Sequence, residues 1–299
     1  MKIEEIEVKS ILSKSGLPGV DWALNPYVGC QFSCKYCYAV FITKWKHSDE
    51  EWGEFLDVKI NAPALLKREL ERRVKRNKSR NYGSIFFSSV TDPYTGAEAK
   101  YQLTRKCLEI LVDFGYKGEV SILTKSPLVV RDIDLLKKLD AEVGITVTTY
   151  EDSVIRFLEG RAPSASARIQ ALRTLHDEGI PMYSFVGPLL PYFVTREEKL
   201  RELFRKLKDA GVNDLCIEHI NLTPIVKERL FTYLRKQSPE LVPYFKRAET
   251  EAYVEKLDSV IYPILRETKL KLTGGGIIHH TRFKKDTRGN LYGTIESKR

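Results

Sequence analysis

The stretch from Asn25 to Tyr38, NPYVGCQFSCKYCY, carries the strongest structural and functional signal in this chain of 299 residues. Three of the five cysteines, Cys30, Cys34 and Cys37, fall within eight residues of it. A proline and a glycine in the same stretch interrupt regular structure, so the backbone can turn and direct three sulfurs toward one point. Thiolates bind iron and zinc, and a cube-shaped iron–sulfur cluster has four irons to ligate. The pattern predicts a [4Fe–4S] loop that leaves one iron open, an arrangement suited to catalysis.

Two other uses of the cysteines require features that the sequence lacks. A zinc site needs a fourth ligand, usually from a second Cys or His pair, and the next histidine, His47, lies ten residues past Cys37 with no partner beside it. A disulfide needs an oxidising compartment, and the residues from Met1 to Glu5 show no secretion signal. No apolar run approaches the roughly 18 residues of a membrane span. We therefore expect a cytoplasmic iron–sulfur protein without a membrane partner, and zinc remains the alternative metal.

The cysteine spacing, with Tyr36 before the last cysteine, resembles the signature of the radical S-adenosylmethionine (SAM) superfamily. Several later motifs resemble, in this order, the branch grouped with spore photoproduct lyase, often labelled DNA repair photolyase-like. These are Thr91-Asp92-Pro93-Tyr94 with Glu98, then Leu103-Thr104-Arg105, Thr124-Lys125-Ser126 and Arg131-Asp132. The resemblance covers about residues 20–225. It implies a [4Fe–4S] cluster and SAM as cofactors, and a reducing partner such as ferredoxin or flavodoxin that supplies the electron for SAM cleavage.

Strand-like and helix-like segments alternate along the chain, which predicts an α/β fold with a parallel sheet. The β-rich runs are 84–89, 119–124, 143–148, 182–186 and 214–218, and the helical patterns are about 62–78, 99–114, 131–140, 164–178 and 195–210. With one strand before Cys30 there are six strand–helix units, which match the partial (β/α)6 TIM-type barrel of the resembled family. We expect an N-terminal extension over 1–20, a barrel core over 21–225, and a C-terminal extension of helices and a strand over 226–299 that closes the barrel.

Polar residues lie at the ends of the predicted strands, where the chemistry of a parallel barrel gathers. Lys125 could neutralise the carboxylate of SAM, and a threonine hydroxyl could meet its ribose. The resemblance adds that Lys125 matches a SAM-binding lysine and that the Tyr36 position lies along the adenine edge. The predicted SAM contacts are Tyr36, Ser89, Thr91, Lys125, Thr148 and Glu218.

A hydrogen-atom donor is not evident in the sequence. Spore photoproduct lyases carry a donor cysteine at the start of the segment that resembles 89–92, whereas this chain has Ser89, whose O–H bond is too strong to donate readily. This departure argues against repair of the spore photoproduct itself. Cys107 falls on an apolar helix stripe and is expected to pack in the core. Cys216 lies in a short strand, where either face could point into the barrel.

The net charge of +9 is concentrated in one helical segment. Eight cations occur in the fourteen residues 67–80, against two glutamates, which is a density expected for contact with a phosphate backbone. A solvated basic helix explains the same density. The candidate nucleic-acid contacts are Arg72, Arg73, Lys75 and Arg76, and further cations follow at Arg282, Lys284, Lys285 and Arg288.

Three functions remain open at this point. The first is radical modification or repair of a nucleic-acid base or sugar. The second is radical modification of a peptide, protein or small molecule. The third is an iron–sulfur or zinc protein that binds nucleic acid without catalysis. Six strand–helix units argue against the third, because a simple cluster carrier needs no barrel.

Overall fold

A computed structural model describes residues 1–280, which divide between two compact units. The first unit comprises Met1–Ser33, Ile42–Ile145 and Thr174–Met182. The second comprises Cys34–Phe41, Thr146–Arg173 and the chain from Tyr183 onward. Because the chain passes repeatedly from one unit to the other, each is described by itself. The predicted boundaries at residues 20 and 225 stay a prediction.

The first unit contains a sheet that is parallel except at one edge. Its strands, in spatial order, are β2 (Leu12–Lys14), β3 (Trp22–Leu24), β6 (Ile85–Phe87), β7 (Val120–Thr124) and β8 (Glu142–Thr146), and only β2 runs antiparallel. Leu24, Phe87, Ile122 and Val143 are partners in register across four of these strands, and all four are fully buried. This apolar row forms the centre of the sheet and explains why the β-rich runs could be located from sequence.

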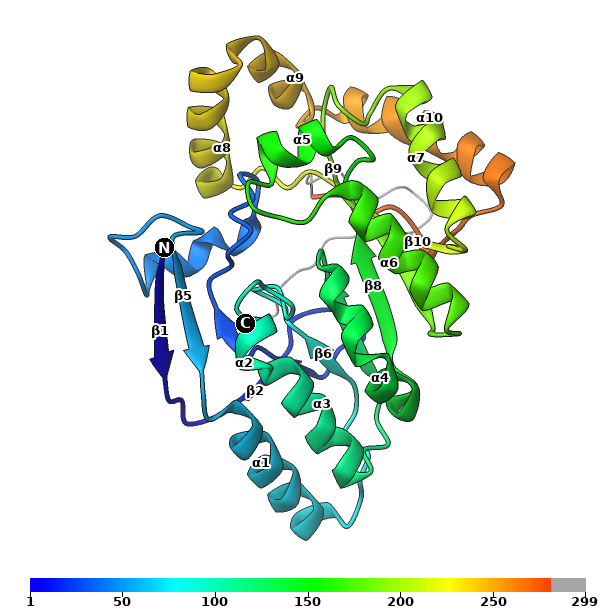
Figure 1. Ribbon diagram of the computed structural model, residues 1–299. Helices are drawn as coiled ribbons and strands as arrows, with labels where there is room; N and C mark the ends of the chain where they lie inside the picture. The colour runs from blue at the N-terminus through cyan, green and yellow to red at the C-terminus, as the bar shows by residue number, and fades with distance from the viewer. Residues whose placement is uncertain (281–299) are drawn as a thin grey trace, which may run out of the picture. The chain divides into compact units, whose positions relative to one another are not determined.

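Helices of the first unit cover this sheet. They are α1 (Ala62–Asn77), α2 (Glu98–Tyr101), α3 (Leu103–Phe114) and α4 (Ile133–Leu139), preceded by the 3-10 helix η2 (Pro127–Asp132). Helix α3 lies beside both α1 and α4 (Figure 1). The single helix predicted over 99–114 is divided at Gln102, whose φ of 54° is left-handed. Helix α3 ends at Phe114, where the predicted helical pattern also ends, and Gly115 caps it with a left-handed φ of 65°.

A second, three-stranded sheet of the first unit was not predicted. Strand β5 (Phe55–Lys59) pairs with β1 (Lys2–Ile6) in parallel and with β4 (Tyr27–Val28) in antiparallel orientation. Four of the five residues of β1 are exposed, so that strand lacks the apolar pattern by which a strand is recognised. This small sheet positions the first cysteine, because β4 ends two residues before Cys30.

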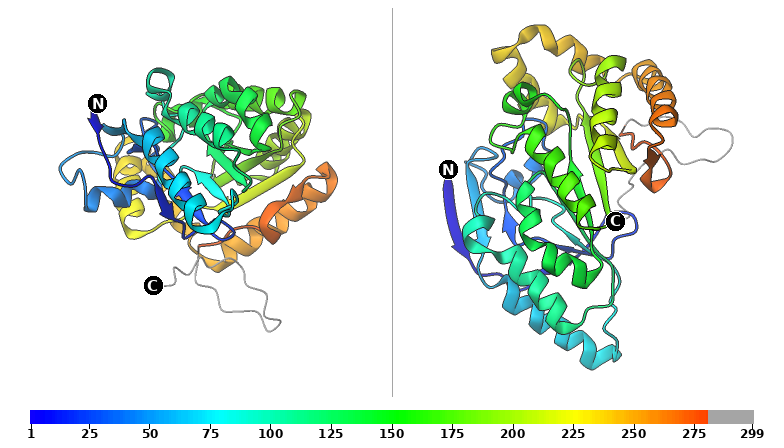
Figure 2. Two further views of the ribbon diagram at one scale, coloured as in Figure 1. Left: turned by 90° about the horizontal axis from the view of Figure 1, so that it is seen from below. Right: turned by 45° about the vertical axis from the view of Figure 1, so that its right-hand side comes forward.

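The second unit repeats the alternation of parallel strands and helices. Its strands are β9 (Met182–Leu189), β10 (Asp214–His219) and β11 (Lys271–Leu272), with β10 between the other two. Its helices are α5 (Asp152–Leu158), α6 (Ala165–Asp177), α7 (Glu197–Asp209), α8 (Pro224–Gln237), α9 (Val242–Arg247) and α10 (Glu251–Thr268). Helices α7 and α10 lie side by side in both views (Figures 1 and 2).

The six strands expected from the sequence are β3, β6, β7, β8, β9 and β10, and at least one helix separates each from the next. The predicted α/β class with mostly parallel strands is therefore confirmed. After residue 225 the described chain contains helices and then the short strand β11, again as predicted. Between residues 1 and 280, no helix has the length and apolar character needed to cross a bilayer.

Candidate functional site: the cysteine loop and the strand ends

The cysteine loop begins after β4 and leads into the 3-10 helix η1 (Tyr38–Lys44). Cys30 and Cys34 are buried and Cys37 is half-buried. The N–H of Ser33 donates to the Cys30 carbonyl at 3.4 Å, and the N–H of Cys37 donates to the Cys34 carbonyl at 3.3 Å, so each interval is bent by its own turn. None of the five cysteines, which all lie within the described chain, forms a disulfide. Two buried cysteines and one half-buried cysteine on one turning loop fit the cluster that the spacing predicts.

Gly29 allows the loop to start where it does. Its φ of 86° is left-handed, and a Cβ at this position would lie 2.6 Å from the carbonyl oxygen of Phe55 in β5. No larger residue fits without moving the strand. The Gly29 carbonyl accepts a hydrogen bond from the hydroxyl of Thr91.

The first half of the loop is attached to the segment after β6. The side-chain oxygen of Gln31 accepts from the N–H of Ala97 at 2.6 Å and from the hydroxyl of Thr95 at 3.1 Å. With the contact between Thr91 and Gly29, these bonds connect the cysteine loop to the Thr91–Tyr94 motif. Thr91, a predicted SAM contact, thus also supports the backbone beside Cys30.

Asp92 connects the same motif to the end of β7. Its buried carboxylate accepts hydrogen bonds from the N–H of Tyr94 at 2.9 Å, the hydroxyl of Thr124 at 2.6 Å and the N–H of Lys125 at 2.8 Å. Burial raises the pKa of Asp92, and the three hydrogen bonds oppose that rise. Lys125 directly follows β7, as predicted, and Asp92 fixes its backbone.

Glu98 is the centre of a buried polar network that sequence reasoning did not identify. Its carboxylate accepts from the hydroxyl of Tyr27 and from Arg131 at 2.7 Å. Arg131 also pairs with Asp132 at 2.7 Å, and Arg105 contacts Asp132 at 2.9 Å. Four of these residues belong to the motifs quoted above, so those motifs have a structural role in joining α2, α3 and η2.

A second buried network lies in the second unit, around Glu159. This carboxylate accepts from the hydroxyls of Tyr36 and Thr148, both predicted SAM contacts, and from the guanidinium of Arg168. Glu159, Arg168 and Thr148 are all fully buried. Burial, followed by the negative charge of Glu159, raises the pKa of Tyr36 well above its usual value. The polar ends of Tyr36 and Thr148 are therefore held by the protein.

The second half of the cysteine loop has its own anchors in the second unit. Arg229 of α8 donates to the carbonyl of Cys34, and the N–H of Lys35 donates to the carbonyl of Leu158 at 2.8 Å. The Lys35 ammonium lies 5.1 Å from the ring centroid of Tyr233. Arg229 was missed because nothing in its sequence surroundings distinguishes it from other helical cations.

The remaining predicted SAM contacts are placed as follows. Ser89 lies two residues after β6, and its hydroxyl accepts from Asn25 at 3.4 Å. Glu218 was expected just past the sixth strand but is the penultimate residue of β10, where His280 contacts its carboxylate at 2.8 Å.

The two cysteines outside the loop are both shielded from solvent to some degree. Cys107 is fully buried in α3, in agreement with a packing role. Burial raises the pKa of Cys216 to about 11.

The predicted nucleic-acid contacts lie on α1. Arg72, Lys75 and Arg76 are exposed. Arg73 instead stacks on Trp22, with its guanidinium carbon 3.7 Å from the ring centroid. The additional cations Arg282, Lys284, Lys285 and Arg288 lie outside the described residues.

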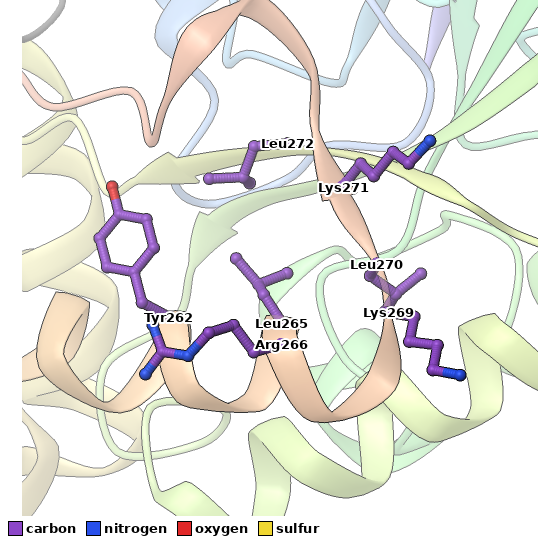
Figure 3. Close-up of a pocket in the computed structure, with 7 residues that line it drawn as sticks. All are labelled: Tyr262, Leu265, Arg266, Lys269, Leu270, Lys271 and Leu272. Carbon is purple, nitrogen blue, oxygen red and sulfur yellow. The ribbon is translucent and has the colours of Figure 1, made fainter.

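A surface hollow of about 400 Å³ between α10 and β11 contains none of the predicted site residues. Figure 3 shows the leucines of this hollow with the cations Arg266, Lys269 and Lys271 around them. Its lining residues are Tyr262, Leu265, Arg266, Lys269, Leu270, Lys271 and Leu272.

The chain is similar to several known proteins. Residues 24–200 match the family model of the radical SAM superfamily. An uncharacterized protein of Methanocaldococcus jannaschii is 34% identical over 268 residues, which cover 89% of this chain and 95% of that protein. A radical SAM Nalpha-GlyT isomerase of Pseudomonas phage M6 is 26% identical over 76% of this chain and 45% of its own length.

Among solved structures, spore photoproduct lyase complexed with dinucleoside spore photoproduct aligns with a TM-score of 0.68 at 16% identity, covering 90% of this chain and 81% of the lyase. This likeness confirms the partial-barrel fold that the sequence predicts. The family match covers more than half of the chain and includes the three cysteines. The cofactors are accordingly a [4Fe–4S] cluster and SAM. The chain belongs to the radical SAM superfamily and is an enzyme of that superfamily.

Proposed function

We propose that this radical SAM enzyme acts on a base or sugar of a nucleic acid. The observation that carries the proposal is the exposed positive charge of α1. Lys67, Arg68, Arg72, Lys75 and Arg76 are exposed, and none forms an ion pair with another residue of the described chain. Glu69, which could neutralise them, accepts instead from the backbone N–H groups of Ile11 and Leu12 at 2.9 and 3.2 Å.

Helix α7 provides an internal comparison. It is also rich in cations, but three of its five cations pair with a carboxylate one turn away on the same helix, and Lys199 pairs with Glu151. The pairs are Arg201–Glu197 at 2.8 Å, Arg205–Asp209 at 3.0 Å and Lys206–Glu202 at 3.1 Å. Such pairing is usual for a solvated helix, whereas like charges at this spacing destabilise it. The absence of pairing on α1, within residues 1–280, favours a phosphate-bearing partner over simple solvation.

An aromatic surface of the second unit supports the same class of substrate. Tyr192 and Tyr244 are 37% and 42% exposed, and their ring centroids lie 4.9 Å apart. Arg196 lies 5.2 Å from the Tyr192 ring and Arg247 lies 6.0 Å from the Tyr244 ring. Exposed aromatic rings beside guanidinium groups are typical of surfaces on which unpaired bases stack.

The relatives are consistent with this proposal. The structural neighbour has been solved with a dinucleoside spore photoproduct, and the phage relative is a radical SAM Nalpha-GlyT isomerase. Since Ser89 stands where spore photoproduct lyases carry a cysteine, the reaction proposed here differs from spore-photoproduct repair. The chain is an enzyme of the radical SAM superfamily. The third alternative, a protein that binds nucleic acid without catalysis, is therefore excluded.

When the cofactors are bound, one-electron cleavage of SAM supplies a 5′-deoxyadenosyl radical that abstracts hydrogen from the substrate. For this chain we assign Lys125 to the carboxylate of SAM, with Ser89 and Thr91 near the same strand ends. Tyr36, Thr148 and Glu218 are the proposed contacts from the second unit. The electron comes from a reducing partner such as ferredoxin or flavodoxin.

The test is the salt dependence of binding to a fluorescent single-stranded oligonucleotide. Each lost phosphate contact should lower the slope of log K against log[salt] by about 0.7. The variant R72E/R76E should therefore have a slope lower by about 1.4 and weaker binding at low salt. The control R235E/K236E changes the net charge by the same amount as R72E/R76E, on exposed residues of α8. It should keep the wild-type slope of log K against log[salt]. Equal binding by both variants would contradict the proposal and favour a peptide or small-molecule substrate.

A further inference from the structure

Three side chains from separate segments of the second unit converge on a cluster that the proposed reaction does not use. His219 is the last residue of β10, Asp258 lies in α10, and His279 lies in the segment that follows β11. Nε2 of His219 is 3.0 Å from one carboxylate oxygen of Asp258, and Nε2 of His279 is 2.8 Å from the other. One donor atom from each residue lies within 4.8 Å of the other two.

The backbone holds this cluster in place. The N–H of His219 donates to the carbonyl of Ile278 at 2.9 Å, and the N–H of Ile278 donates to the carbonyl of Ile217 at 2.8 Å. The segment around Ile278 thus extends the parallel pairing of β10. His219 and His279 therefore emerge from adjacent backbones, and their ring centroids lie 4.7 Å apart.

The cluster is shielded from solvent. His219 and His279 are 4% and 5% exposed, and the side chain of Asp258 is 19% exposed. The chain has five histidines, and two of them meet in this one buried position. Burying two imidazoles and a carboxylate is costly unless they are well paired or bind a metal.

We propose that His219, Asp258 and His279 bind one divalent transition-metal ion, with zinc as the best fit. Zinc–nitrogen and zinc–oxygen bonds of about 2.0–2.2 Å in a tetrahedral site place neighbouring donor atoms about 3.3 Å apart. The two nitrogen–oxygen distances, 3.0 and 2.8 Å, are close to this value but run to different oxygens of Asp258. All three donor atoms lie within 4.8 Å of one another, so a movement of one imidazole toward the oxygen that the ion uses would admit it. Two imidazoles and one carboxylate leave a fourth position for water. The same ligand set suits ferrous iron, but the burial leaves little room for six ligands.

The metal would attach the segment 277–280 to β10. His280 follows directly and contacts Glu218 at 2.8 Å, so the ion would also help to hold a proposed SAM contact. Without metal, the same three side chains would form a carboxylate bridged to two imidazole N–H groups. Metal analysis distinguishes these two states. This inference does not depend on a nucleic-acid substrate.

The experiment measures zinc and iron together in the full-length, anaerobically reconstituted protein after dialysis against zinc and then buffer. We expect one zinc per chain in addition to the cluster iron. The variant D258N keeps the shape of the bridge but removes the ligand charge, and its zinc content should fall below a tenth of an equivalent while its iron content is unchanged. A matched control is H176A, because His176 is exposed and pairs with Asp177 on the surface.

A second measurement covers the case in which D258N folds poorly. At a zinc concentration about 100-fold above Kd, the midpoint temperature of the wild-type protein should rise by roughly 5 °C, and that of H279Q should not. Absence of zinc from the wild-type protein, or an equal zinc content in D258N, would overturn the proposal. Zinc that survives D258N but is lost from C34A would place the ion on the cysteine loop and would also overturn it.

Discussion

The carboxylate of Asp92 accepts the backbone N–H of Lys125 at 2.8 Å, although 33 residues separate them. The same carboxylate accepts the hydroxyl of Thr124 at 2.6 Å. Asp92 therefore fixes the end of β7 and the backbone of Lys125, the proposed SAM-binding lysine, which directly follows that strand. The Thr91–Tyr94 motif thus has a structural role, holding the end of β7, that its sequence alone does not reveal.

Replacing Asp92 with Asn should weaken SAM binding without abolishing the cluster. In D92N one of the two acceptor oxygens becomes an NH2 group, which cannot accept either the N–H of Lys125 or the hydrogen bonds from Thr124 and Tyr94. A buried donor is then left without its acceptor, at a cost of about 1–3 kcal/mol. Urea unfolding should show this loss of stability, and iron analysis should show normal cluster content. The exposed Asp134 provides the control, because D134N should change stability by less than about 1 kcal/mol.

Removing the side chain of Lys125 should lower the affinity for SAM by about tenfold to a hundredfold, because a charge-assisted hydrogen bond contributes about 1.5–3 kcal/mol. Equilibrium binding of SAM to the reconstituted protein measures this effect. K138A removes an exposed cation from α4 and should bind SAM normally. If K125A and K138A bind SAM equally well, Lys125 is not the partner of the carboxylate.

The buried Glu159–Arg168 pair should be much more important for stability than the half-exposed Glu151–Lys199 pair. Arg168 is fully buried, so E159A leaves its charge without a carboxylate and should cost about 3–5 kcal/mol. E151A breaks a partly solvated pair at 2.9 Å and should cost less than about 1 kcal/mol. Denaturant unfolding compares the two variants. Similar losses in both would show that Arg168 is solvated in the folded protein.

Lys59 should make the stability of the protein depend on pH in the alkaline range. Burial lowers the pKa of Lys59 to about 8, and its ammonium donates to the carbonyl of Asn25 at 2.8 Å. Between about pH 8 and 10.5 the unfolded chain keeps a proton that the folded chain has lost, so stability rises with pH.

The wild-type protein should therefore gain up to about 1.4 kcal/mol per pH unit relative to K59M across this window. Below pH 8 Lys59 is protonated in both the folded and the unfolded chain. The difference in the free energy of unfolding between wild type and K59M should therefore be constant there. Urea unfolding at several pH values gives the slope. A flat difference in the free energy of unfolding between wild type and K59M would mean that Lys59 is solvated.

The sequence allowed the fold class and the cysteine loop to be predicted because both depend on local patterns. Apolar runs such as 119–124 identify buried strands, and the spacing of Cys30, Cys34 and Cys37 identifies the loop. The buried networks could not be predicted, since Glu98 and Arg131, or Tyr36 and Glu159, meet only through the fold. Strand β1 was missed because its residues are mostly exposed.

The three proposed zinc ligands could not be predicted from the sequence either. His219, Asp258 and His279 are separated by 39 and 21 residues and follow no recognised ligand spacing. Their convergence depends on the pairing of the segment around Ile278 with β10, which no local pattern indicates.

The most direct test of the central claim follows a hydrogen atom from substrate to cofactor. The reconstituted enzyme is incubated with SAM, a reductant and perdeuterated cellular nucleic acid, and the 5′-deoxyadenosine formed is analysed by mass spectrometry. Our account predicts deuterium in 5′-deoxyadenosine, and unlabelled product when only the protein fraction is deuterated. Deuterium transfer from the protein or small-molecule fraction, with none from nucleic acid, would contradict it.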